Sequence, residues 1–139
     1  REAVRAAGVA LRVDGRGLPQ LVMADPRALA RIADNLVANA ARYARSEVRM
    51  SLAWESGGLE LAVADDGPGF ADAALARATE PFWGESKGGG GHLGLGLYVS
   101  RLLAEKHGGG LEVANGPGGG AIARATLSAP VAQGSPESN

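Results

Sequence analysis

The chain contains no cysteine, which excludes disulfide bonds and metal sites built from thiolates. It also lacks a charge excess of either sign, because 14 lysines and arginines face 15 aspartates and glutamates. Such a balance favours neither nucleic acid nor an anionic membrane surface as a partner. No uninterrupted apolar run approaches the roughly 20 residues that a membrane-spanning helix needs. We therefore expect no contact of this domain with nucleic acid or membrane, and the missing cysteines are compatible with the cytoplasm.

The amino terminus has neither an initiator methionine nor the apolar segment of a signal peptide. We therefore expect the chain to have been cut from a longer protein. Its 139 residues, of which 45% are hydrophobic, fit one domain with a real core. We expect that domain to span residues 1–129 and the polar stretch 130–139 to be a flexible tail.

Glycine is the residue in clear excess. The chain has 22 glycines, well above the usual share of about 7%. They gather at 67–69, 84–96, 108–110 and 116–120 without a collagen-like repeat. Local clusters of this kind indicate backbone that turns sharply or approaches a ligand closely.

The first half of the chain predicts a strand, a long helix and a hairpin. Partial alternation over residues 8–14 indicates a strand. Asp25 and Pro26 make a good helix start, and apolar residues at helical spacing extend that helix to about Ala44. Period-two alternation over 47–54 and 59–63 then predicts two paired strands.

The second half predicts another helix and a closing pair of strands. The helix should run from about residue 95 to 106 and end at Gly108. Its expected apolar face consists of Leu95, Tyr98, Val99, Leu102 and Leu103. Strands are expected over 110–114 and 121–128, and most of 71–93 is expected to be a mobile loop. The elements together predict an α+β fold, a two-layer sandwich with helices on one face of a mixed sheet.

The first helix carries two asparagines at i and i+4, Asn35 and Asn39, and Arg42 and Tyr43 extend that polar face. Asparagine is a poor residue inside a helix because its side chain competes for backbone hydrogen bonds. Amide oxygens suit a hard cation such as Mg²⁺, and arginine suits phosphate. A lone asparagine pair is more often an ordinary solvated face, so this pattern alone decides nothing.

Two glycine-containing motifs follow. Asp65 stands at a strand end before Gly67 and Gly69, where a carboxylate can accept a hydrogen bond from an exocyclic amine. The alternative is a plain glycine-proline turn. Gly94, Leu95, Gly96 and Leu97 open the second helix, whose free N–H groups suit phosphate. The alternative there is a flexible linker, and the sequence is not a P-loop because no Gly-Lys-Ser/Thr follows.

The order of these motifs resembles the ATPase superfamily of gyrase, Hsp90, histidine kinases and MutL over about residues 8–128. The resemblance implies the Bergerat-type fold and binding of ATP with Mg²⁺. It implies that Asn39 coordinates Mg²⁺ and that Asp65 reads the adenine amino group. The implied cofactor-binding set is Asn39, Tyr43, Asp65, Gly67, Gly69, Gly94, Leu95, Gly96 and Leu97, with Asn35 and Arg42 in catalytic roles. Residues 80–83, Glu-Pro-Phe-Trp, resemble the phenylalanine motif in the lid of histidine kinases.

One position separates the branches of this superfamily. The gyrase, Hsp90 and MutL branch carries a glutamate general base one turn before the Mg²⁺-binding asparagine, and here that place holds Asn35. An amide cannot take a proton from water. Asn35 with the pair Arg42 and Tyr43 therefore points to a histidine kinase. The chain departs from the pattern at His92 and Leu93, where histidine kinases often carry a small hydroxyl residue.

Neither histidine has the context of a phospho-acceptor, because His92 and His107 are not followed by an acidic residue. The resemblance therefore implies a separate dimerisation and phospho-acceptor domain as partner, and a response regulator acting through the parent protein. The implied location of the domain is the cytoplasm, which is compatible with a parent protein anchored in the inner membrane. Two alternatives stay open: a degenerate nucleotide-binding module and, less favoured by Asn35, a hydrolase of the gyrase or Hsp90 kind.

Overall fold

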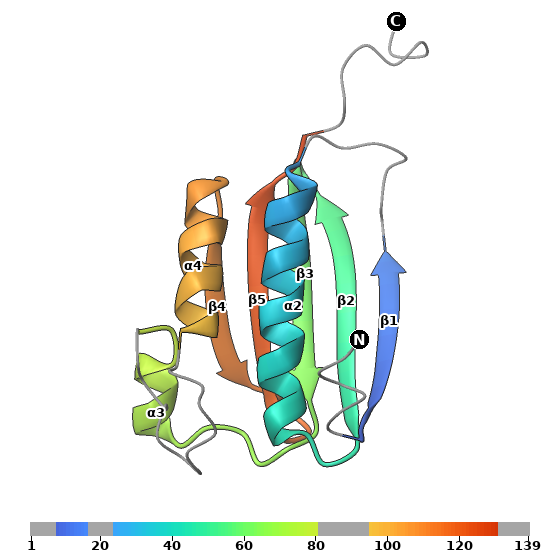
Figure 1. The fold of residues 1–139 in the computed structure, drawn as a ribbon, viewed down its shortest axis with the longest axis vertical. Coiled ribbons are helices and arrows are strands. Elements are labelled where there is room, and N and C mark those ends of the chain that lie inside the picture. The colour runs from blue at the N-terminus through green and yellow to red at the C-terminus, as the bar shows by residue number, and fades with distance from the viewer. Residues whose placement is uncertain (1–7, 17–23, 81–94, 131–139) are drawn as a thin grey trace, which may run out of the picture.

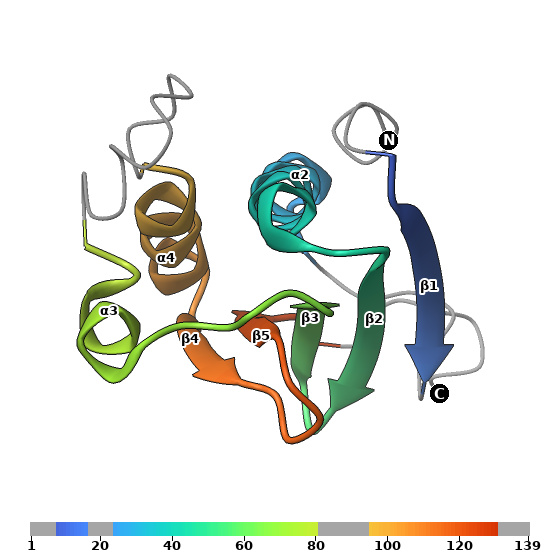
Figure 2. The ribbon, with the colours of Figure 1, turned by 90° about the horizontal axis from the view of Figure 1, so that it is seen from below.

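The computed structural model describes residues 8–16, 24–80 and 95–130. Five strands form one sheet in the order β1-β2-β3-β5-β4, and helices α2 and α4 cover one of its faces (Figure 1, Figure 2). The pair β1 and β2 is parallel, and the other neighbouring strands are antiparallel. The predicted α+β sandwich with a mixed sheet is therefore confirmed.

Strand β1 (Ala10–Arg16) is followed along the chain by helix α2 (Pro26–Tyr43) and strand β2 (Glu47–Glu55). Asp25 caps the helix as predicted, because its Oδ1 accepts the backbone N–H of Arg27 at 2.9 Å. The apolar positions of α2 form its buried face: Ala28, Ile32, Leu36, Val37, Ala40 and Ala41. The helix thus covers the sheet with the residues that its sequence period selects.

Strand β3 (Gly58–Asp65) pairs with β2 in the predicted hairpin. The turn between them holds Ser56 at φ 55° and Gly57 at φ 83°, the left-handed pair that matches the twist of a two-residue hairpin loop. At this end of the sheet, Trp54 Nε1 donates to the carbonyl of Ala129 at 2.6 Å. That bond ties the end of β2 to the chain just beyond the last strand.

Helix α4 (Gly96–Lys106) leads into β4 (Gly110–Asn115) and β5 (Ala121–Ser128). Gly108, at φ 89°, ends the helix as predicted. The predicted apolar face was wrong in part: Leu103 packs against the core as expected, but Leu102 is 43% exposed. The buried residues of α4 are Leu97, Ser100 and Ala104. The small side chains of Ser100 and Ala104 let α4 pack closely against α2 and the strands below, and this packing sets the rotation of the helix.

A short helix, α3 (Asp72–Arg77), lies in the segment predicted to be mostly a mobile loop, so that prediction was wrong for these residues. Six residues are too few for a helical period to show in the sequence. Arg77 pairs with Glu80 at 3.1 Å, and Ala78 between them is buried. Residues 81–93 of the expected loop, which include the last three residues of the lid motif and the Gly88–Gly91 run, lie outside the described residues, as does most of the expected tail.

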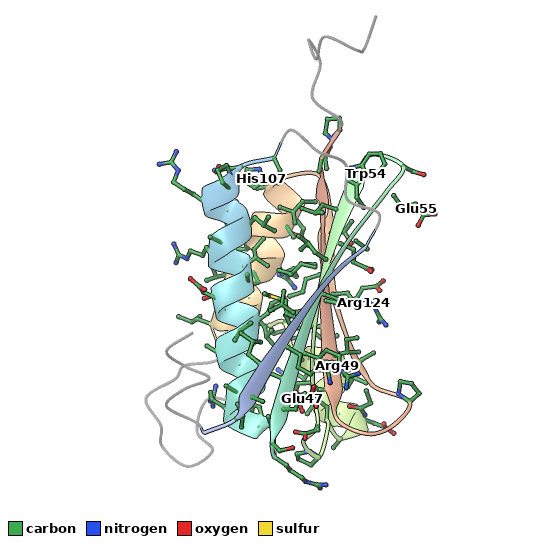
Figure 3. All side chains as sticks on the ribbon, turned by 90° about the vertical axis from the view of Figure 1, so that its right-hand side faces the viewer. Glu47, Arg49, Trp54, Glu55, His107 and Arg124 are labelled. Atoms are coloured by element: carbon green, nitrogen blue, oxygen red, sulfur yellow. The ribbon has the colours of Figure 1, made fainter. Side chains whose placement is uncertain are left out.

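The second face of the sheet carries charged side chains. Figure 3 shows Glu47, Arg49 and Arg124 pointing away from the helices. Glu47 Oε2 lies 3.4 Å from Arg12 Nε and 3.7 Å from Arg49 Nη2, so the carboxylate bridges β1 and β2. None of the helices in the described part of the chain is long and apolar enough to cross a bilayer.

Ser100 offers a test of the packing between the helices. Its side chain is fully buried, and its hydroxyl has no hydrogen-bond partner. Because a buried polar group without a partner costs about 1–3 kcal/mol, we expect Ser100→Ala to raise the free energy of unfolding by about 1 kcal/mol. Urea denaturation with an unchanged m-value would measure the gain. A loss of stability would instead show that the hydroxyl is bonded in solution.

Candidate functional site

Helix α2 and strand β3 end, and helix α4 and strand β5 begin, at the same end of the sandwich (Figure 1). The residues there line a pocket. It has an empty volume of about 240 Å³, part of it open to solvent. Its lining comes from two helices (α2 and α4), three strands (β3, β4 and β5) and the turn after β3: Leu36, Asn39, Ala40, Val63, Asp65, Phe70, Leu97, Val113, Ala121, Ile122 and Ala123. Three residues predicted from separate motifs, Asn39, Asp65 and Leu97, therefore share one pocket.

Small side chains create the recess. Ala40 on α2 and Ala121 and Ala123 on β5 line it, and none of them fills the space between helix and sheet. Phe70 adds an aromatic ring to the lining. The result is a mostly apolar cavity with a few polar groups, which is the usual composition of a small-molecule site.

Asp65 is the acidic group of the pocket. Burial raises the pKa of its carboxyl, while the backbone N–H groups of Gly67 and Ala121 act in the opposite direction and the charge of Asp66 adds to the rise. Its Oδ1 accepts the N–H of Gly67 at 2.8 Å. A carboxylate has about four acceptor sites on its two oxygens, so Asp65 can accept a further hydrogen bond from a ligand.

The glycines after Asp65 are required by close contacts. A Cβ on Gly67 would overlap the carbonyl oxygen of Tyr43 at the end of α2. Gly69 has φ 79°, and a Cβ there would lie 2.8 Å from Asn115 Oδ1. Gly120, which opens β5, also approaches closely, because its Cβ would overlap the carbonyl oxygen of Asp65. The turn is therefore packed between the end of α2 and the β4–β5 hairpin.

Asp66 fixes the same turn to the loop between α2 and β2. Its Oδ1 accepts the backbone N–H groups of Arg45 at 2.7 Å, Ser46 at 3.0 Å and Glu47 at 3.2 Å, and its Oδ2 accepts the Ser46 hydroxyl at 2.7 Å. These hydrogen bonds, those of Ser46 first, hold the pKa of Asp66 well below its ordinary value of 3.8. The carboxylate thereby connects the turn after β3 to the loop that follows α2.

We expect Asp66→Ala to lower the melting temperature by several degrees, because it leaves three N–H groups without their acceptor. The effect depends on pH. The folded-state pKa is depressed, so the stabilisation is fully present above pH 3.8 and is lost as pH falls through the folded-state value. The wild type should therefore lose stability more steeply than the variant in acid. Glu55→Ala, an exposed residue at the far end of β2, is the control.

The helix α2 residues predicted to act together are placed differently. Asn35 and Asn39 are both half-buried, but only Asn39 lines the pocket. Arg42 and Tyr43 are exposed beyond it, and the Arg42 guanidinium lies 5.3 Å from the centre of the Tyr43 ring. The structure thus brings Asn39 to Asp65 and leaves the other three at the rim or outside.

The amino end of α4 borders the same pocket. Leu97 is 8% exposed and contributes to the lining. Leu95 occupies the N-cap position, and its apolar side chain makes no capping hydrogen bond. The backbone N–H groups of the first turn of α4 therefore receive no bond from the N-cap side chain. A Cβ on Gly96 would meet no atom of the described residues within 4 Å. Gly94 lies outside the described residues.

The donor set fits Mg²⁺ only in a particular way. The described residues contain no group of three or more histidine, cysteine, aspartate or glutamate side chains that could hold a metal ion. Mg²⁺ usually takes one or two protein ligands and completes its shell with water and substrate phosphates. A single amide oxygen from Asn39 is compatible with a Mg²⁺ ion that arrives with a nucleotide.

Several residues of the site were missed by sequence reasoning. Phe70 and Val113 line the pocket, Asn115 and Gly120 hold its turn, and Asp66 anchors it. The hairpin of β4 and β5 was predicted, but its register was not. The cluster of glycines at 116–120 was the one available signal of a close approach.

The sequence model of the family described as "Histidine kinase-, DNA gyrase B-, and HSP90-like ATPase" matches residues 24–131. A sensor histidine kinase component, HK1, from Mycobacterium tuberculosis is 35% identical over 128 residues, which cover 91% of this chain and 76% of that protein. The sensor protein kinase PilS of Pseudomonas aeruginosa is 40% identical over 114 residues, which cover 76% of this chain and 21% of PilS.

Solved structures agree with these relatives. Full-length ShkA, crystallised with AMPPNP, matches with a TM-score of 0.80 and 27% identity, over 94% of this chain and 28% of ShkA. The mycobacterial sensor histidine kinase MprB matches with a TM-score of 0.73 over 94% of this chain and 91% of that structure. At 24% identity the second likeness speaks for the fold alone. The chain spans about a third or less of several curated relatives that it matches.

Proposed function

This chain belongs to the histidine kinase-, DNA gyrase B- and HSP90-like ATPase family, as an ATP-binding catalytic domain of the sensor histidine kinase kind, and we propose that it transfers the γ-phosphoryl group of ATP to a histidine in a separate domain. The observation that carries the proposal is the meeting of Asn39 and Asp65 in one pocket. They come from a helix and a strand 26 positions apart in the sequence, and each suits a different part of the same nucleotide.

Different residues of the pocket bind different parts of the nucleotide. Asp65, which already accepts the N–H of Gly67, accepts a further hydrogen bond from the exocyclic amine of adenine. Val63, Phe70 and Leu97 surround the flat ring and exclude water from it. When bound, ATP supplies the phosphoryl group, and Mg²⁺ held by Asn39 offsets the charge of the phosphates.

The remaining predicted residues act at the phosphate end. Arg42 is exposed near the end of α2, from which its guanidinium can reach phosphate oxygens. The first turn of α4, from Leu95, and Gly94 before it offer backbone N–H groups to the same phosphates. Tyr43 stacks against Arg42 and orients it. Asn35 provides no general base, so the chain activates neither water nor a hydroxyl, and the acceptor is an imidazole that is nucleophilic near neutral pH.

The proposed roles of these residues also imply the partners of the chain. The acceptor histidine lies in the dimerisation domain of the parent protein, and a response regulator receives the phosphoryl group from there. We assign residues 1–129 to the catalytic domain and 130–139 to a tail. Because ATP is a cytoplasmic donor, the proposal places the domain on the cytoplasmic side, whether or not the parent is anchored in the inner membrane.

The test mixes this chain, labelled ATP, Mg²⁺ and the acceptor domain of the parent. We expect a phosphoryl group on the acceptor that is labile in acid and stable in base, as a phosphorylated histidine is. The chain alone should bind ATP, hydrolyse it barely and carry no label. An acceptor domain with its histidine replaced by glutamine is the control.

Two results would contradict the proposal. Rapid ATP hydrolysis by the isolated chain would place it with the gyrase and Hsp90 branch. Tight ATP binding without transfer to the acceptor domain would make it a degenerate nucleotide-binding module.

A further inference from the structure

Asn115, the last residue of β4, reaches across to the turn that follows Asp65. Its Oδ1 accepts the backbone N–H of Phe70 at 2.8 Å, and its Nδ2 donates to the carbonyl of the same residue at 2.9 Å. The carboxamide thus makes the pair of hydrogen bonds that a neighbouring strand would make with one residue. Phe70 lies outside every strand, and this side chain supplies the partner that its backbone would otherwise lack.

The residue held in this way belongs to the pocket. Phe70 lines it together with Asp65 and Val113. Val113 precedes Asn115 by two positions on β4, so both side chains stand on the same face of the strand. Strand β4 therefore contributes Val113 to the lining of the pocket and Asn115 to the hydrogen bonds that hold Phe70, another lining residue.

Gly69 is adapted to the same contact. Its φ of 79° is unfavourable for residues with a side chain, and a Cβ there would come within 2.8 Å of Asn115 Oδ1. The space that Gly69 leaves free is the space that the carboxamide of Asn115 occupies. The backbone conformation of Gly69 and its contact with Asn115 together account for the second glycine of the motif.

We propose that Asn115 is a positioning residue of the nucleotide site: by clamping the backbone of Phe70, it keeps the adenine pocket in shape before the nucleotide arrives. The inference rests on the proposed function, because it takes adenine as the occupant of the pocket. Asn115 is not among the pocket-lining residues, and its effect on binding passes through Phe70.

The experiment uses Asn115→Ala and Asn115→Asp, with Glu112→Ala on the same strand as the control. Alanine removes both hydrogen bonds, and an ionised aspartate keeps the acceptor but cannot donate to the Phe70 carbonyl. Affinities for adenosine, ADP and ATP are measured at neutral pH by calorimetry, and exchange of the Phe70 amide is followed by NMR. The melting temperature is recorded alongside, since Asn115 is exposed and both variants should fold.

We expect both variants to bind adenosine, ADP and ATP about tenfold more weakly, by a similar factor for each. The Phe70 amide should exchange faster, amides in the middle of β3 should be unaffected, and Glu112→Ala should resemble the wild type. A merely structural role would lower the melting temperature and leave these affinities unchanged.

Three outcomes would overturn the inference. They are unchanged affinity despite faster exchange at Phe70, unchanged exchange at Phe70, and a loss confined to ATP with adenosine unaffected. Failure of the wild type to bind adenosine or ATP would overturn the proposed function and this inference with it. Unaffected variants beside a binding wild type would overturn the inference alone.

Discussion

Asp65→Asn is expected to weaken binding of ATP and ADP by about 10- to 150-fold, the range for losing a hydrogen bond to a charged group. Asp65 accepts the N–H of Gly67 at 2.8 Å, and in the proposed complex it also accepts a hydrogen bond from the amine of adenine. An asparagine has only one acceptor oxygen there, so its own NH₂ must face one of those donors. Isothermal titration of the wild type and the variant with ADP measures the loss.

Guanine nucleotides provide the sharpest control for this prediction. Guanine presents a carbonyl oxygen where adenine presents its amine, and that oxygen would meet the carboxylate of Asp65. The wild type should therefore strongly prefer ATP to GTP, and the preference should shrink in Asp65→Asn, whose NH₂ can donate to guanine. Equal affinity of the wild type for ATP and GTP would show that Asp65 does not read the base.

The raised pKa of Asp65 gives the same prediction a pH dependence. The amine of adenine needs the ionised carboxylate, and burial raises the pKa at which that form is lost, above the ordinary 3.8. ADP affinity should therefore begin to fall at a higher pH than for an ordinary aspartate. Expressing the result as the ratio of wild-type to variant affinity cancels the titration of the phosphates. A ratio that is flat with pH would contradict the role of Asp65.

Asn39→Ala is expected to weaken Mg²⁺-dependent ATP binding by roughly 10- to 100-fold, the size of effect seen when a group that supports a bound metal is removed. Asn39 lines the pocket together with Asp65, and we propose that its amide oxygen holds the Mg²⁺ ion that accompanies the nucleotide. Adenosine, which has no phosphates and recruits no metal, should bind the variant almost as well as the wild type. Titrations of ATP with and without Mg²⁺, beside adenosine titrations, separate the two parts.

The matched control for Asn39 is Arg31→Ala, an exposed position on the same helix. It should leave ATP and adenosine binding unchanged. Equal losses of ATP and adenosine affinity in Asn39→Ala would instead show that the asparagine supports the packing of the pocket.

The parts of the fold that can be predicted from sequence alone are those that depend on local residue patterns. Asp25 and Pro26 predict the start of α2, and the alternation of apolar and polar residues through β2 and β3 predicts the hairpin. Asn39 and Asp65 could be proposed as site residues because each stands in a short motif of unusual composition. Their meeting in one pocket follows from the topology that those patterns encode.

The parts that failed or were missed depend on contacts between distant segments. The buried face of α4 is decided by its packing on α2, where Ser100 and not Leu102 faces inward. Asn115 holds Phe70 from 45 positions away in the sequence, and only the register of β4 with β5 brings it there. Asp66 stood in a recognised motif, but its partners in the loop at residues 45–47 have no sequence signature.

The two hairpin turns of this sheet differ in how much extra chain they can accept. At the β2–β3 turn a Cβ on Gly57 meets nothing within 4 Å, and the turn lies at the end of the sheet away from the pocket. At the β4–β5 turn, Gly116 N–H bonds the carbonyl of Gly120 at 2.9 Å, and Gly120 in turn rests on the backbone of Asp65. Lengthening the second turn should displace Gly120 and with it Asp65, the residue that we propose contacts adenine. A reporter protein inserted after Ser56 should therefore leave nucleotide affinity unchanged. One inserted between Gly116 and Gly120 should change that affinity according to the length of the insertion.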